Sequence, residues 1–130
     1  MSKNPRRPTP PPPVRTVGGT TIVALYGEID LVTAPPLAAR LDALASAPHP
    51  DLVLDLRLVS FIDCAGLAVL CRARNTVRAR QGRLRLIAGG RGFLRVLRAA
   101  QLGGVFEIQP ELPGELTRAP VTGAGVRRTA

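Results

Sequence analysis

The chain has 130 residues, which is the length of one domain. Hydrophobic residues make up 45% of it and aromatic residues only 3%, so the core must be aliphatic and few rings can stack on nucleic acid bases. The net charge of +9 favours an acidic partner, and every apolar stretch is far shorter than the roughly 20 residues of a membrane span. Without a recognisable secretory signal, we expect a cytoplasmic protein.

The two ends of the chain lack the periodicity of helices or strands. The first 13 residues are basic and end in four consecutive prolines, and the last 18 mix Pro, Gly, Thr and Arg. Proline interrupts helices and central strands, and such mixtures bury little apolar surface. We therefore predict disordered tails at 1–13 and 113–130 around one folded domain at 14–112.

Between the tails the apolar pattern alternates between strand and helix periods. In chain order we predict strands at 14–17 and 20–26, a helix from Thr33 to Ala47, a strand at 51–57, a helix between Asp63 and Gly82, a strand at 84–88, a helix at 92–100 and a strand at 105–108. This order predicts an α/β fold with a mixed sheet of four to five strands, covered by crossover helices.

The junctions carry their own signals. Gly18-Gly19 is typical of a hairpin turn, and the segment 27–30 should leave its strand as a loop. Thr33 can cap the first helix, because the prolines that follow it occupy a turn in which a missing N–H costs least. Gly82 is the expected C-terminal stop of the second helix.

The turn from Asp63 to Gly66 lies where a strand passes into a helix. The Asp63 carboxylate can accept hydrogen bonds from the first helical N–H groups and so act as N-cap. The small residues after it leave the helix N-terminus open to an anion, an acidic side chain or a carbonyl of a partner. The alternative is an ordinary cap, with Gly66 serving close helix packing.

Catalytic and metal chemistry find little support in the sequence. Cys64 and Cys71 would lie roughly 10 Å apart on one helix, too far for a disulfide or a shared metal. His49 is the single histidine and sits between two prolines, so no Cys-His or Ser-His-Asp set can be assembled. We expect no cofactor, no metal and no enzymatic activity.

Two segments together resemble a known family. They are GEID at 27–30 and VSFIDCAGLAVL at 59–70, and the likeness extends over roughly residues 15–110. This pair of motifs resembles the STAS domain family of bacterial anti-sigma factor antagonists and related transporter domains. The resemblance implies partner switching in transcription regulation: the antagonist binds an anti-sigma factor, usually one with a serine-kinase fold, and so releases a sigma factor.

The resemblance also implies a docking site, on a protein expected to be a monomer. Asp30 and Asp63 would flank it, and Gly66 and Leu67 would contact the partner. The full set of partner-binding residues implied in this way is Glu28, Asp30, Asp63, Cys64, Ala65, Gly66 and Leu67.

The sequence departs from the family at Cys64. In the family the residue after the motif Asp is a Ser or Thr that the kinase phosphorylates to end binding, and neither Cys64 nor Ala65 has a hydroxyl. Three interpretations stay open. Cys64 is a neutral stand-in for Ser in a permanently unphosphorylated binder, or a redox switch at a helix N-terminus, or a sign that the protein has another partner.

An alternative function uses the arginines. Nine Arg and no acidic residue lie between Arg72 and Arg98, which suggests one basic face. Such a face is either a solvated surface or a binding site for nucleic acid or another acidic partner. The scarcity of aromatic residues and the lack of a nucleic-acid motif make nucleic acid the less favoured partner.

Overall fold

The structure is a computed structural model and describes residues 11–117. Every predicted element is present, in the predicted order. The elements are β1 (Val14–Val17), β2 (Thr20–Ile29), α1 (Ala34–Leu44), β3 (Asp51–Ile62), α2 (Cys64–Ala79), β4 (Arg83–Ile87), α3 (Gly92–Ala99), β5 (Glu107–Gln109) and α4 (Gly114–Thr117). Only the last of these, α4, was not predicted. No helix in the described part of the chain has the length and apolar character needed to cross a membrane.

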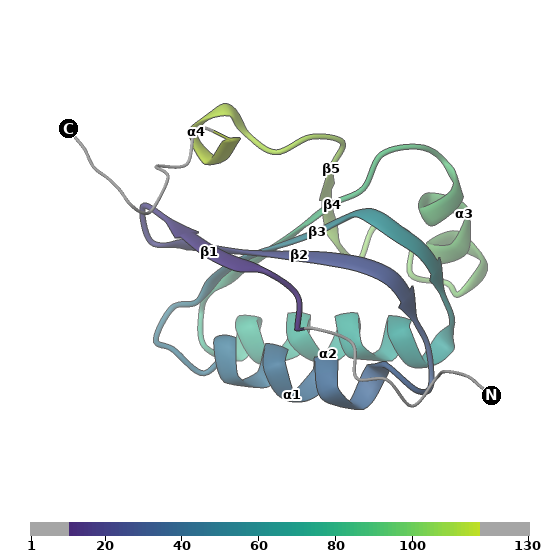
Figure 1. The fold of residues 1–130 in the computed structure, drawn as a ribbon, viewed down its shortest axis with the longest axis horizontal. Helices are drawn as coiled ribbons and strands as arrows, with labels where there is room; N and C mark the ends of the chain where they lie inside the picture. The colour runs from purple at the N-terminus through teal and green to yellow at the C-terminus, as the bar shows by residue number, and fades with distance from the viewer. Residues whose placement is uncertain (1–10, 118–130) are drawn as a thin grey trace.

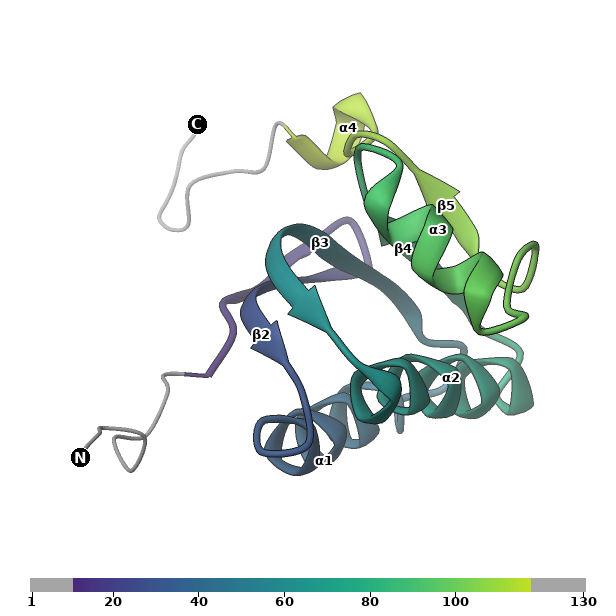
Figure 2. The same ribbon diagram turned by 90° about the vertical axis from the view of Figure 1, so that its right-hand side faces the viewer.

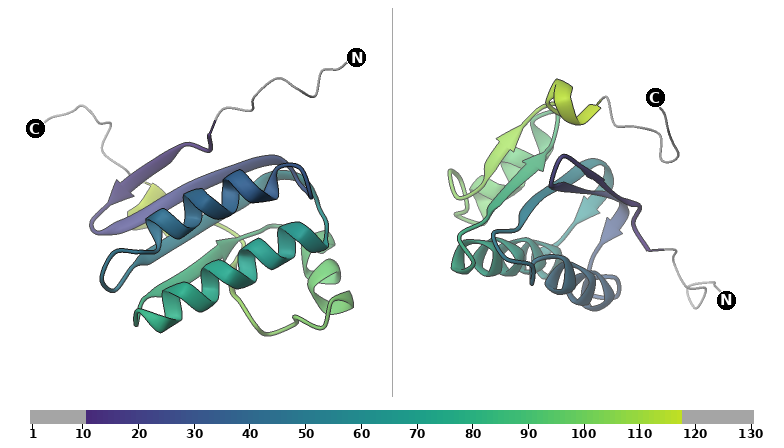
Figure 3. Two further views of the ribbon diagram at one scale, coloured as in Figure 1. Left: turned by 90° about the horizontal axis from the view of Figure 1, so that it is seen from below. Right: turned by 90° about the vertical axis from the view of Figure 1, so that its left-hand side faces the viewer.

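The strands form one five-stranded sheet in the order β1-β2-β3-β4-β5. β1 pairs with β2 antiparallel, and the three other pairs are parallel. Helices α1 and α2 lie side by side across one face of the sheet, and α4 lies on the opposite side (Figures 1 and 3). The predicted α/β fold with a mixed sheet is therefore confirmed.

The core has one layer on each face of the sheet, because successive side chains of a strand point to opposite faces. Leu52 and Leu54 of β3 point towards α1 and α2 in the larger cluster, whereas Val53 between them joins the smaller one. Burial on both faces explains the nearly continuous apolar run of this strand. The smaller cluster consists of Ile22, Val53, Ile87 and Leu116.

Leu116 corrects the predicted start of the C-terminal tail. Its side chain is only 3% exposed, and its carbonyl oxygen accepts a hydrogen bond of 3.0 Å from the Arg15 guanidinium. The folded part thus extends beyond residue 112, because α4 supplies an apolar residue that covers the second face of the sheet. The remainder of the two predicted tails, 1–10 and 118–130, lies outside the described residues.

β2 and β3 both extend further than predicted. Gly27, Glu28 and Ile29 belong to β2 rather than to a loop, and they pair with Val59, Phe61 and Ile62 of β3. An extra residue in β3 between Val59 and Phe61 shifts the register there, and Gly27 adopts a φ of +75°. The extended pairing and the bulge together convert an apparent loop into strand.

Smaller corrections concern element ends. α1 ends at Leu44, with Ala45 capping it through a 2.8 Å bond from its N–H to the Leu41 carbonyl. The left-handed residue after α2 is Gln81, with φ of +60°, and not Gly82. Gly82 is required for another reason: a Cβ there would lie 2.1 Å from the Pro50 carbonyl oxygen. β5 begins at Glu107, later than predicted.

Candidate functional site

The site is built where β2 and β3 outrun the rest of the sheet. β4 pairs only with residues 51–55 of β3, so the carboxyl halves of β2 and β3 continue as a two-stranded ribbon. Figure 2 shows this ribbon curving towards the N-terminus of α2. The Asp63 N–H donates to the Ile29 carbonyl at 3.2 Å, which ties the two strand ends together. Both family motifs therefore meet at one end of the molecule.

Asp63 is the N-cap of α2, as predicted. Its backbone is extended, and its Oδ1 accepts a 3.0 Å hydrogen bond from the Gly66 N–H. Gly66 itself is buried, and a Cβ there would lie 2.5 Å from the Ile29 carbonyl oxygen and 2.6 Å from Cγ1 of Ile62. The first turn of α2 thus rests directly on the ends of both strands, and only glycine fits.

Asp30 organises the loop between β2 and α1. Its Oδ1 accepts from the N–H groups of Val32 and Thr33, at 3.0 and 3.1 Å. The Thr33 hydroxyl donates to the Glu28 carbonyl at 2.8 Å and accepts from the Asp30 N–H at 2.9 Å. Thr33 is the N-cap residue of α1, as predicted, but its side chain makes no capping hydrogen bond and closes this loop instead. The loop holds its shape by its own hydrogen bonds.

The structure brings the predicted site residues together, but they differ in their exposure to solvent. Glu28 and Cys64 are exposed, and Asp30, Asp63 and Ala65 are half-buried. Gly66 and Leu67 are buried, and Leu67, 6% exposed, packs in the larger core cluster. The predicted contact role of Gly66 and Leu67 is corrected on this point, since they support the surface from beneath.

Large apolar side chains are exposed at this end of the molecule, and two of them, Leu31 and Val32, escaped the sequence reasoning. Leu31 and Val32 are 76% and 77% exposed, and Phe61 is 53% exposed. Leu31 and Val32 follow Asp30 directly, and Phe61 pairs across the ribbon with Glu28. The available signal was an apolar pair inside a turn, where polar residues are usual. Large apolar side chains exposed at one end of a molecule are candidates for a binding surface.

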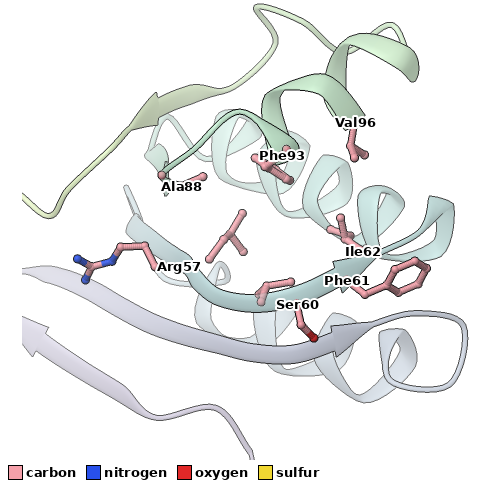
Figure 4. Close-up of a pocket in the computed structure, with 11 residues that line it drawn as sticks. Arg57, Ser60, Phe61, Ile62, Ala88, Phe93 and Val96 are labelled. Carbon is pink, nitrogen blue, oxygen red and sulfur yellow. The ribbon is translucent and has the colours of Figure 1, made fainter.

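A groove separates the ribbon from α3 (Figure 4). Its volume is about 640 Å³, and its walls come from the carboxyl half of β3, the turn after β4 and one side of α3. The lining residues are Leu56, Arg57, Val59, Ser60, Phe61, Ile62, Ala88, Gly89, Gly92, Phe93 and Val96. Phe61 thus belongs both to the exposed apolar surface and to the groove.

Asp55 stabilises the start of this ribbon. A register shift after Asp55 places an extra residue in β3, and the Asp55 carboxylate accepts from the Arg57 N–H and guanidinium at 2.7 to 3.0 Å. Burial raises the pKa of Asp55, but the hydrogen bonds from Arg57 outweigh it and hold the pKa below its usual value. The bulge is therefore fixed by a charge-assisted side-chain contact.

The arginine-rich run does not form the single basic face that the sequence suggested. Arg72 pairs with Asp42 and Arg83 pairs with Glu107, while Arg85 is buried and pairs with Asp51 at 3.2 Å. Hydrogen bonding by Arg83 also lowers the pKa of Glu107. Within residues 11–117, Arg78 and Arg80 at the end of α2 have no such acidic partner, and the same holds for Arg91 at the N-cap of α3 and for Arg95 and Arg98 within it.

Cys64 and Cys71 are both free thiols. Across the described ranges no three His, Cys, Asp or Glu side chains gather in a way that could hold a metal ion. The chemistry that the site does offer is an open helix N-terminus, acidic groups held in fixed positions and an exposed apolar cluster. The fold and this surface define a small α/β domain of the protein-binding class.

The family model of the STAS domain matches residues 11–114. The chain belongs to this family, and the resemblance seen in the sequence is confirmed. It is 30% identical over 99 residues to the anti-sigma-F factor antagonist RsfA of Mycobacterium tuberculosis, covering 74% of this chain and 77% of that protein. It is 32% identical over 94 residues to the anti-sigma-B factor antagonist of Listeria monocytogenes, covering 72% and 82%.

A solved structure agrees with the sequence relatives. The crystal structure of an anti-sigma factor antagonist from Mycobacterium paratuberculosis superposes with a TM-score of 0.69 at 31% identity. The match covers 83% of this chain and 92% of that one. Fold and sequence therefore point to the same family.

Proposed function

We propose that this protein is a cytoplasmic anti-sigma factor antagonist, which binds an anti-sigma factor and so releases a sigma factor for transcription. It acts as a binding partner and not as a catalyst. Membership of the STAS family and the names of its relatives support this function. The observation that carries it is the exposure of Leu31, Val32 and Phe61 at the end of the molecule where the two motifs meet, since exposed apolar side chains offer a partner contact area.

The docking surface consists of two kinds of residue. Glu28, Asp30, Asp63, Cys64 and Ala65 supply the polar part and the helix N-terminus. The apolar part is supplied by Leu31, Val32 and Phe61, which belong to the same two segments of the chain and are exposed to a partner. Because apolar anchors dominate binding energy, these three should contribute most of the affinity.

The anti-sigma factor is proposed to have a serine-kinase fold, and the antagonist to bind it as a monomer. Cys64 occupies the position that carries phosphate in the family. Lacking a hydroxyl, it acts as a neutral stand-in for serine, so the kinase cannot end binding by phosphorylating this position. The exposure of Cys64 gives a partner access to it.

The test is isothermal titration of the purified chain with the serine-kinase-type anti-sigma factor of the same organism. Asp63→Ala should weaken binding by about tenfold or more, because it removes the N-cap that shapes the docking turn. Asp42→Ala is the matched control, since Asp42 lies on α1 and contacts Arg72 instead of the docking turn. Absence of binding by the unaltered chain, or equal loss in both variants, would overturn the proposal.

A phosphorylation assay tests the proposed role of Cys64 independently of the titration. Incubated with the same anti-sigma factor and ATP, the unaltered chain should take up no phosphate at residue 64, whereas Cys64→Ser should take up phosphate and then lose affinity. Persistent binding of the phosphorylated variant would contradict the role given to this position.

A further inference from the structure

The groove beside α3 has an open strand edge as one wall. From Leu56 onwards β3 keeps its pairing with β2 but has no partner on its other side among the described strands. Such an edge can take up an extended segment of another chain by backbone hydrogen bonding. The Arg57 N–H is already bonded to Asp55, so pairing would involve the residues after the bulge.

The groove is lined mainly by apolar side chains. Figure 4 shows Phe93 and Val96 projecting from α3 opposite Ile62 of β3, with Phe61 at the end of the strand. No acidic residue lines it, and its single arginine, Arg57, is paired with Asp55. Apolar walls next to backbone hydrogen-bonding groups suit a peptide segment, which brings both kinds of group.

The outer side of α3 carries three positive charges. Arg91, Arg95 and Arg98 are four and three residues apart, so they form one stripe along the helix. All three are exposed, and no ion pair in the described part of the chain involves them. This stripe adjoins the lip that Gly92 and Val96 give to the groove, and this position distinguishes it from Arg78 and Arg80, which also lack an ion pair but lie at the far end of α2.

From these observations we propose that the groove and the arginine stripe bind an acidic segment of the anti-sigma factor. An apolar side chain of that segment enters the groove beside Phe93 and Val96, its backbone follows the open edge of β3, and its carboxylates face Arg91 and Arg95. The identity of this partner rests on the proposed function. The inference extends the docking surface from the turn at Asp63 across Phe61 to α3.

A polypeptide fits this surface better than a nucleic acid. Phosphates would engage the arginine stripe but would leave the apolar groove unfilled, and the one arginine inside the groove already has an acidic partner. An acidic segment with an apolar side chain satisfies both features at once. Electrostatic attraction of this kind raises the association rate and weakens as salt screens it.

The test compares two charge-reversal variants of the full chain by titration with the anti-sigma factor. Arg91→Glu/Arg95→Glu should weaken binding about tenfold or more, and its affinity should depend less on salt between about 50 and about 300 mM NaCl than that of the unaltered chain. The matched control is Arg78→Glu/Arg80→Glu, which makes the same charge change at the far end of α2. It should bind within about twofold of the unaltered chain.

A third variant examines the groove itself. Val96→Asp places a carboxylate in the apolar wall and should weaken binding about tenfold without changing the circular dichroism spectrum. Unchanged affinity in both α3 variants, with a loss in Asp63→Ala, would overturn this inference and leave the proposed function standing. Absence of binding by the unaltered chain would instead remove the proposed function. An equal loss of affinity in the Arg78→Glu/Arg80→Glu control would show that the effect comes from net charge alone, and it would overturn the inference as well.

A titration with DNA tests whether the arginine stripe binds nucleic acid instead. A duplex DNA of random sequence, titrated with the unaltered chain and with Arg91→Glu/Arg95→Glu, should bind neither at moderate salt. Tight binding to DNA that the double variant abolishes, together with unchanged binding to the anti-sigma factor, would assign the stripe to nucleic acid and contradict the inference.

Discussion

The two ends of the sheet differ in how many of their backbone and side-chain groups find contacts within the chain. At the amino end, Gly82 packs against Pro50, and the Arg83 N–H donates to the Pro50 carbonyl at 2.8 Å. Asp51 accepts from the Thr20 hydroxyl at 2.8 Å and pairs with the buried Arg85. At the carboxyl end, β2 and β3 outrun β4, several large apolar side chains are exposed, and a groove lies beside an unpaired edge.

This difference separates stability from binding within one small domain. The amino end is closed by internal contacts, so substitutions there should affect folding alone. At the carboxyl end the backbone is also fixed, by Asp30, Asp63 and Gly66, but Leu31 and Val32 are largely exposed to solvent. That end can therefore present a fixed shape to a partner without adding to its own core.

The largest expected effects come from a pair of glycines, one at each end. Gly82→Ala and Gly66→Ala should each lower the free energy of unfolding by about 2–3 kcal/mol, because each Cβ meets a backbone oxygen at 2.1 or 2.5 Å. Chemical denaturation measures both. Only Gly66→Ala should also weaken binding to the anti-sigma factor, since it displaces the first turn of α2. Equal affinity losses in both folded variants would erase the proposed distinction between the ends.

Substitutions of the exposed apolar pair, Leu31 and Val32, should affect binding without affecting stability. Leu31→Ser/Val32→Ser should leave the free energy of unfolding within about 0.5 kcal/mol of the unaltered chain, since both side chains are largely in solvent. Affinity for the anti-sigma factor should nevertheless fall about tenfold, or about 1.4 kcal/mol. Thermal unfolding and calorimetric titration provide the two readings. A large loss of stability with full affinity would show that this pair serves the fold.

A smaller effect concerns the bulge that begins the ribbon. Asp55→Asn should cost about 1 kcal/mol at neutral pH, because it weakens the hydrogen bonds to Arg57. The pKa of Asp55 is lowered in the folded chain from 3.8, so its contribution is present above that value and is lost as the pH falls through the folded pKa. The stability difference between the two chains should therefore shrink under acid conditions.

Asp42→Asn is the control for that measurement, because the Asp42–Arg72 pair is exposed to solvent and should contribute little to stability at any pH. A difference between Asp55→Asn and the unaltered chain that stays constant down to strongly acid pH would contradict the role of the Asp55 carboxylate.

The sequence predicted the order of the main elements and the N-cap at Asp63, because both depend on local patterns. It failed where distant segments decide the outcome. Gly27 to Ile29 reads as a loop, but pairing with the end of β3 makes it strand. Leu67 reads as a contact residue because the motif includes it, yet its position on α2 directs it into the core. The groove at α3 was beyond prediction, since its walls come from elements that only folding brings together.

Backbone hydrogen exchange of the chain, alone and in complex with the anti-sigma factor, tests the central claim most directly. Complex formation should slow exchange in residues 28–33 and 60–66 and along α3, and should leave the segment around Pro50 and Gly82 unchanged. Protection confined to the amino end of the sheet, or to the outer sides of α1 and α2, would contradict the assignment of the docking surface.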